Sequence, residues 1–129
     1  MSLEAAFYSR LTGHAGLSAL VGTRIYPKQA PQGATEPYIT YSLISTADRV
    51  SAMGSDTGNV SSLYQFDIWD ADELTAINVA KQLRLALQRW RNSSGTVVDD
   101  TFVAGERSGF DKETSTHRRI MDFRFKYRE

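Results

Sequence analysis

The last segment of the chain constrains the fold most strongly, because its apolar and charged residues alternate. In "THRRIMDFRFKYRE" (residues 116–129), Met121, Phe123 and Phe125 are separated by single charged residues. A period of two is typical of a strand with one face in a core and the other toward solvent. We predict a half-buried antiparallel strand, with His117, Arg119, Met121, Phe123, Phe125 and Tyr127 on one side and Arg118, Ile120, Asp122, Arg124 and Lys126 on the other.

Three further stretches have the patterns of strands. "PYITYSLIST" (residues 37–46) has two partly apolar faces, and its first residue is one of the few strand positions that accept proline. "VSSLYQFDIWD" (residues 60–70) alternates over its whole length. Residues 46–59 between them are small, polar and spaced by glycine, so we predict a long hairpin with a mobile loop at its tip. "TVVDDTFVAGERSG" (residues 96–109) reads as a strand interrupted at Asp99 and Asp100.

Helical spacing is clearest in "DADELTAINVAKQLRLALQRW" (residues 70–90), where Asp70 or Asp72 can cap the N-terminus. Two shorter helices are expected before the first strand. One covers residues 3–12 with Ser2 as its N-cap, and the other runs from Leu17 to Gly22. The expected apolar stripe of the long helix comprises Leu74, Ile77, Ala80, Leu83, Ala86, Leu87 and Trp90.

These elements predict an α+β fold with the order α-α-β-β-β-α-β-β. A chain of 129 residues is expected to form one domain, residues 1–129. We predict an antiparallel or mixed sheet of about four to five strands, packed by one long helix and short N-terminal helices.

Composition argues against several classes of protein. Lys and Arg together number 15, as do Asp and Glu, so no net charge favours a nucleic-acid or membrane partner. The absence of cysteine excludes disulfides and thiolate metal sites, and no apolar run reaches the length of a membrane span. We also expect no signal peptide.

Motifs for catalysis or cofactors are missing from the sequence. The two histidines, His14 and His117, lie far apart, and "DIWDADE" (residues 67–73) reads as a strand end followed by a helix cap. Neither a nucleophile elbow nor a phosphate loop occurs. We expect no enzyme activity, no cofactor and no metal. The alternative of a small ligand-binding or catalytic domain requires an enclosed polar pocket with perturbed ionisable groups.

All three prolines lie in "RIYPKQAPQGATEPYITYSLIS" (residues 24–45). Proline fixes φ and biases the preceding residue toward extended backbone, so this exposed segment is expected to be stiff. A stiff, polar segment suits docking, because less conformational entropy is lost on binding. Tyr26, Tyr38 and Tyr41 beside it are either core residues or interface anchors.

A basic cluster near the C-terminus comprises Arg118, Arg119, Arg124, Lys126 and Arg128. One interpretation is a solvated outer face that also blunts an edge strand. The other is a charged face between subunits, with the acidic partners Asp99, Asp100 and Asp111 on the neighbouring copy.

The chain resembles the tail completion proteins of long-tailed bacteriophages, also described as tail terminators or tail-to-head joining proteins. The most specific stretch is "LVGTRIYPKQAPQGATEPYITY" (residues 20–41), followed by "FDIWD" (residues 66–70) and an amphipathic helix, "AINVAKQLRLAL" (residues 76–87). A late strand, "RRIMDFRFKY" (residues 118–127), completes the order, so the resemblance covers nearly the whole chain.

The resemblance implies a structural virion protein without enzymatic activity. Such a protein forms a ring, typically hexameric, that caps the head-proximal end of the tail tube, ends tube polymerisation and joins the tail to the head connector. Its partners would be further copies of itself, the tail tube protein and the connector or stopper protein, without membrane or specific nucleic acid. It would lie in the neck of the virion, and in the host cytoplasm during assembly. Another neck component, such as a head-tail stopper or a tail-tube-like subunit, is the alternative.

The predicted interface joins the proline segment, the hairpin tip and the basic cluster. Its residues are Tyr26, Pro27, Lys28, Gln29, Pro31, Gln32, Tyr38, Arg49, Met53, Asp56, Arg118, Arg119, Arg124 and Lys126.

Overall fold

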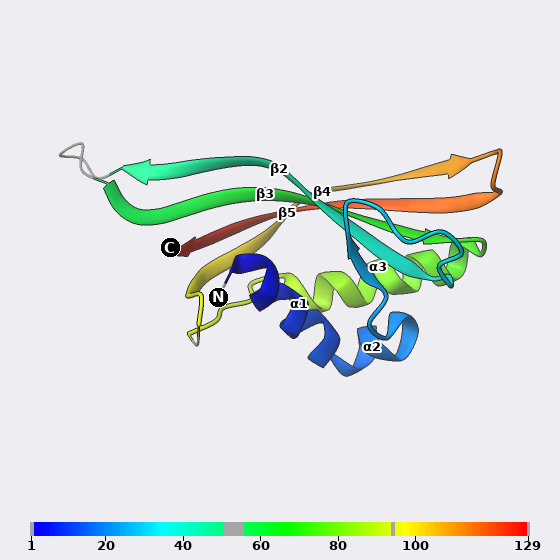
Figure 1. Ribbon diagram of the computed structural model, residues 1–129, viewed down its shortest axis with the longest axis horizontal. Helices are drawn as coiled ribbons and strands as arrows, with labels where there is room; N and C mark the ends of the chain where they lie inside the picture. The colour runs from blue at the N-terminus through cyan, green and yellow to red at the C-terminus, as the bar shows by residue number, and fades with distance from the viewer. Residues whose placement is uncertain (1, 51–55, 94, 129) are drawn as a thin grey trace.

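The computed structural model describes residues 2–50, 56–93 and 95–128 and confirms the predicted order of elements (Figure 1). Three helices pack against one face of a five-stranded sheet, and no helix of the described residues lies on the other face (Figure 1). The elements are α1 (Leu3–Gly13), α2 (Ala15–Val21), β1 (Ile25–Pro27), β2 (Tyr38–Val50), β3 (Asp56–Asp70), α3 (Glu73–Leu87), β4 (Val98–Asp111) and β5 (Thr116–Arg128).

The strand order in the sheet is β1-β2-β3-β5-β4. β1 pairs with β2 in parallel, and every other neighbouring pair is antiparallel, so the sheet is mixed. β5 is therefore an interior strand. The idea that its basic residues blunt a sheet edge is wrong, because β3 and β4 occupy both of its edges.

Phe7 of α1 lies at the centre of the core and is fully buried. Its ring meets those of Tyr41 and Tyr64 edge-on, with centroids 5.0 and 5.2 Å away, and stacks on Phe125 at 5.3 Å. Tyr41 is therefore a core residue and not an interface anchor. The alternation of β5 is confirmed, because Met121, Phe123 and Phe125 are fully buried.

The ends of the helices lie close to the residues predicted from the sequence. Ser2 caps α1, with its Oγ accepting a hydrogen bond from the Ala5 N–H at 3.1 Å. Gly22 follows α2 with a φ of 58°, a conformation that favours glycine. Asp72 precedes α3, and its carboxylate accepts a hydrogen bond from the Thr75 hydroxyl at 2.8 Å.

α3 differs from the prediction in rotation and length. Leu74 and Ile77 were expected in the core, but their side chains are 70% and 37% exposed. The predicted Ala80, Leu83, Ala86 and Leu87 are buried, together with Ala76 and Val79 in place of Leu74 and Ile77. Trp90 follows the helix and is partly buried against the core. Apolar residues cover more than half of this helix, so two overlapping stripes fit its spacing, and packing selects the one rich in alanine. At 15 residues α3 is only modestly longer than α1 with 11, so three helices rather than one long helix cover the sheet.

The segment predicted as a loop, residues 46–59, is strand over much of its length. β2 runs to Val50 and β3 begins at Asp56, with Thr46 paired to Ser62. Polar, glycine-containing composition does not prevent pairing in a hairpin, because the neighbouring strand supplies the hydrogen bonds. The β2–β3 and β4–β5 hairpins extend beyond the helices toward opposite ends of the molecule (Figure 1).

Two smaller features concern the edges of the sheet. Residues 25–27, assigned to the proline segment from the sequence, form the short strand β1. The interruption predicted at Asp99 and Asp100 is a shift of register between Val98 and Asp100 within a continuous β4.

Candidate interaction surface

The face of the sheet without helices carries a chain of polar contacts between neighbouring strands. Arg107 of β4 donates to Asp122 at 2.9 Å and to Gln65 at 3.2 Å. Gln65 donates in turn to Asp67 at 3.1 Å, and Arg118 donates to the same carboxylate at 3.0 Å. Arg107 and Arg118 on this face are thus paired with carboxylates of the same chain.

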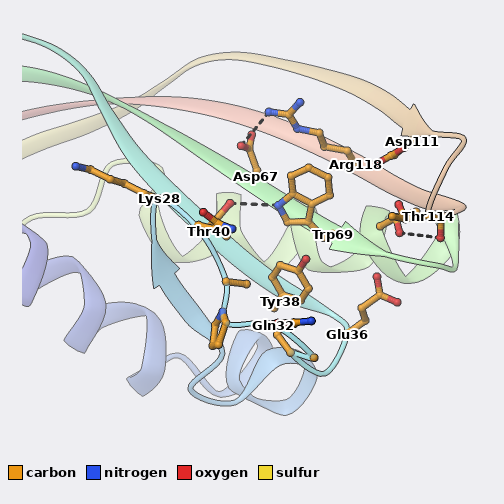
Figure 2. A pocket seen from close by; sticks show the side chains of 16 residues that line it. Lys28, Gln32, Glu36, Tyr38, Thr40, Asp67, Trp69, Asp111, Thr114 and Arg118 are labelled. Atoms are coloured by element: carbon orange, nitrogen blue, oxygen red, sulfur yellow. Dashed lines mark hydrogen bonds and ion pairs between the residues drawn. The ribbon is translucent and has the colours of Figure 1, made fainter.

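A groove of about 680 Å³ lies at one end of this face, between residues 28–36 and the tip of the β4–β5 hairpin (Figure 2). Its floor is formed by side chains of β2, β3 and β5. Trp69 lies at the centre, with its Nε1 donating to the Thr40 hydroxyl at 3.2 Å. The Trp69 ring stacks beside that of Tyr38, with centroids 6.5 Å apart, and the Arg118 guanidinium lies 4.9 Å from its centroid.

Burial and charge shape this groove. Desolvation, reinforced by the negative charge of Glu36, raises the pKa of Tyr38 above its ordinary value. The Nε of Arg118 is buried and has no hydrogen-bond partner among the described residues. The groove therefore offers stacked rings, carboxylates and a guanidinium to a partner.

Residues 28–36 form the wall of the groove and are held at both ends. The Lys28 N–H donates to the Tyr41 carbonyl at 2.7 Å, and Lys28 has a φ of 63°. Within the segment the Ala34 N–H donates to the Pro31 carbonyl at 3.1 Å. At the other end, Arg24 Nε donates to the Pro37 carbonyl at 3.0 Å. The wall is thus tied to β2 and to the C-terminal end of α2.

The structure brings several of the predicted interface residues together. The residues of the prediction that line the groove are Lys28, Gln29, Pro31, Gln32, Tyr38 and Arg118. Tyr26 lies next to the groove, with its ring centroid 6.1 Å from that of Tyr38. Pro27 is exposed at the end of β1.

The other predicted residues lie elsewhere. Arg124 donates to Ser61 at 3.1 Å and Lys126 lies 5.3 Å from the Phe102 ring centroid, both on the helix-free face but away from the groove. Arg119 lies on the opposite face and donates to Glu106. Arg49 and Asp56 belong to the strands of the β2–β3 hairpin, and Met53 lies outside the described residues.

Two of the three acidic residues proposed as partners of a neighbouring copy form ion pairs within the chain. The third, Asp111, lines the groove and accepts a hydrogen bond from the Glu113 N–H at 3.0 Å. Asp99 accepts from Arg128 at 3.0 Å, and Asp100 pairs with Arg89 at 3.0 Å. This pairing leaves little reason for these two carboxylates to set the register between subunits.

Sequence reasoning missed Asp67, Trp69 and Thr40 as groove residues. Asp67 and Trp69 alternate with the core residues Phe66 and Ile68, so following the outer side of that strand would have found them. Their position beside Arg118 depends on the pairing of β3 with β5, which the local pattern does not contain.

The described residues contain no group of three or more His, Asp or Glu side chains that could hold a metal ion. None of the described helices combines the length and apolar character needed to cross a membrane.

Fold and groove define a small α+β domain with an aromatic and charged groove on the helix-free face of its sheet. The family model described as tail completion protein gp17 matches residues 5–128, so the chain belongs to this family. Family membership assigns the chain a structural role in the tail and points to a protein without enzymatic activity. No curated protein sequence matches the chain significantly.

Two solved structures share the fold. A chain from "Virion of native gene transfer agent (GTA) particle" superposes with a TM-score of 0.82 at 22% identity, over 99% of this chain and 96% of that chain. A second solved structure superposes with a TM-score of 0.67 at 15% identity, over 98% of this chain and 94% of that chain.

Proposed function

We propose that this protein caps the head-proximal end of the tail tube of a phage, a prophage or a related particle. There it ends polymerisation of the tube and joins the tail to the head connector. The observation that carries the proposal is the family match over residues 5–128, which is nearly the whole length of the chain. The fold shared with a chain of a gene transfer agent virion supports the same setting.

The working form is a homo-oligomeric ring, a hexamer, located in the neck of the virion after assembly in the host cytoplasm. A ring needs two different surfaces that complement each other on neighbouring copies. It also needs further surfaces for the tube protein and for the connector or stopper protein. The groove walled by residues 28–36 is one such surface, since its wall is tied to the sheet before any partner arrives.

Deletion of the gene, followed by electron microscopy of the lysate, tests the proposal. We expect filled heads beside detached tails, many of them abnormal in length, because nothing would stop the tube or attach it. Detached tails of normal length would indicate a head-tail stopper instead. An absence of tails would indicate a tube subunit. Normal joined particles would contradict any role in joining.

A further inference from the structure

β2 has a neighbouring strand, β1, along only part of the edge that faces away from β3. β1 pairs with Ile39, Thr40 and Tyr41, and the pairing ends there. Beyond Tyr41, no described residue forms a strand pair on this side of β2. We call residues 42–47 the β2 open edge.

The outer strand β4 has the same arrangement at the other side of the sheet. Val98 exchanges backbone hydrogen bonds with Asn92 at 2.8 and 3.0 Å, and the Thr101 carbonyl accepts from Arg89 N–H at 2.7 Å. The Val103 N–H donates to the Gln88 side chain at 2.8 Å. Beyond Val103, no described residue pairs with this side of β4. We call residues 105–111 the β4 open edge.

A shift of register lies close to the point where each strand loses its outer neighbour, and each of the two strands has a second shift elsewhere. The register shifts between Leu43 and Ser45 in β2, and between Val103 and Gly105 in β4. A bulge increases the local twist and turns the strand away from its previous direction. Each open edge therefore belongs to a hairpin arm that leaves the helix-covered part of the sheet, at opposite ends of the molecule (Figure 1).

Both arms expose large apolar side chains. Leu43 and Ile44 are 50% and 51% exposed, and Phe110 is 53% exposed beside His117. Exposed apolar residues on an open strand edge favour association with another chain, and natural monomers avoid this combination. A partner is therefore expected at both open edges.

We propose that the β2 open edge of one copy pairs with the β4 open edge of the next copy, so that the sheet continues from subunit to subunit. This inference rests on the ring of the proposed function and names the contact that builds it. β2, β3, β5 and β4 are successively antiparallel, so β2 and β4 run in opposite directions. A neighbour in the same orientation thus presents its β4 antiparallel to β2.

The positions of the two edges fit a closed ring. They lie on different strands and at different ends, so the contact joins two unlike surfaces, as head-to-tail assembly requires. Because the edges are offset along the strands, the strands must tilt relative to the ring axis, as strands do in a closed barrel. Two like edges would instead form a two-fold dimer, and the test separates these cases.

Cysteine cross-linking tests the contact directly, because the chain has no cysteine of its own. Ala47 of β2 is exposed, and a Cβ at Gly109 of β4 would meet nothing within 4 Å. Particles would be assembled with Ala47→Cys plus Gly109→Cys, then treated with a short thiol cross-linker that tolerates small differences in register. The matched control pairs Ala47→Cys with Ala19→Cys, an exposed residue of α2.

We expect a ladder of covalent multimers from the double variant, and monomers from each single variant and from the control pair. Dimers from a single variant would indicate two-fold contact between like edges and overturn the proposal. If joined particles contain the double variant but yield only monomers after cross-linking, the proposal is also overturned.

A second test removes one hydrogen-bond donor from the β4 open edge. The Val103 N–H points away from β5, toward Gln88. The β5 partners of Ser108 and Val103 are Arg119 and Phe123, which are an even number of residues apart, so the Ser108 N–H also points away from β5. Ser108→Pro removes this outward N–H without removing a donor to β5. Ser108→Ala keeps the N–H and is the control.

With Ser108→Pro we expect the far-UV circular dichroism of the native chain and a fall in joined particles of about tenfold or more, while Ser108→Ala joins normally. Normal joining by a folded Ser108→Pro protein would contradict the proposal. If Ser108→Pro fails to fold, the cross-linking result decides. Failure of the proposed function is recognised separately, from the gene deletion, which would then give normal joined particles, detached tails of normal length or no tails.

Discussion

Arg118 of β5 and Asp67 of β3 form an ion pair across the helix-free face, with Nη2 and Oδ2 3.0 Å apart. The Asp67 residue is only 9% exposed, and its second oxygen accepts from Gln65 at 3.1 Å. The pair therefore joins two central strands at the floor of the groove.

We expect Asp67→Asn to lower the free energy of unfolding by about 1–3 kcal/mol, because the mutation leaves the Arg118 guanidinium without its charged partner. Urea denaturation would measure the change. The cycle with Arg118→Gln and the double variant isolates the coupling between the two side chains. Equal stability of Asp67→Asn and the native chain would contradict a structural role for the pair.

The Phe7 ring anchors α1 to the sheet through contacts with four other aromatic rings. We expect Phe7→Ala to lower the free energy of unfolding by about 3–5 kcal/mol, since it leaves a cavity at the centre of the core. Tyr8→Ala is the matched control, because the neighbouring Tyr8 is 37% exposed and should change stability by less than about 1 kcal/mol. A comparable loss in both variants would contradict the central position of Phe7.

Tyr64 makes the free energy of unfolding depend on pH in the alkaline range. Burial and a hydrogen bond of 2.9 Å to the Glu4 carboxylate raise the pKa of its phenol well above the ordinary value. The folded chain thus holds this proton more tightly than the unfolded chain does. Its contribution to stability is complete below the unfolded pKa of about 10 and is lost as pH rises beyond it.

We expect Tyr64→Phe to lose stability less steeply than the native chain between about pH 9 and pH 11. Urea denaturation across this range would show the difference in slope. Identical slopes would show that other groups carry the alkaline transition.

Mutation of Pro31 tests whether the stiffness of the groove wall favours binding of a partner. Its side chain is exposed, so Pro31→Ala should change the free energy of unfolding by less than about 1 kcal/mol, mainly through the unfolded chain. We expect a larger effect on joining of heads and tails, because docking must then order a looser segment. A matched Thr35→Ala variant, changed at another exposed position of the same segment, should join normally. Equal losses of stability and joining in Pro31→Ala would defeat the idea.

Much of this fold follows from local patterns in the sequence. The alternation of residues 117–127 gives β5 and its core side, and the capping residue Ser2 gives the start of α1. Strand neighbours cannot be read in this way, because pairing depends on contacts between distant segments. For this reason the sequence left open an interpretation in which the basic residues of β5 blunt a sheet edge, although β5 lies inside the sheet.

The same limit applies to the candidate surface. The proline segment and Arg118 were predicted separately, and only the strand order brings them to one groove. Arg119 was grouped with its neighbour Arg118, but adjacent residues of a strand point to opposite faces, and Arg119 meets Glu106 instead. The ion pairs between described residues of β4 and β5 depend on the register of these two strands, so the sequence pattern did not predict them.

Immunogold labelling of intact particles with an antibody against this chain tests the central claim most directly. Action at the head-proximal end of the tail predicts gold confined to the junction of head and tail, and no gold on the detached heads and tails of the deletion strain. Gold spread along the tube, or gathered at the distal end, would contradict it.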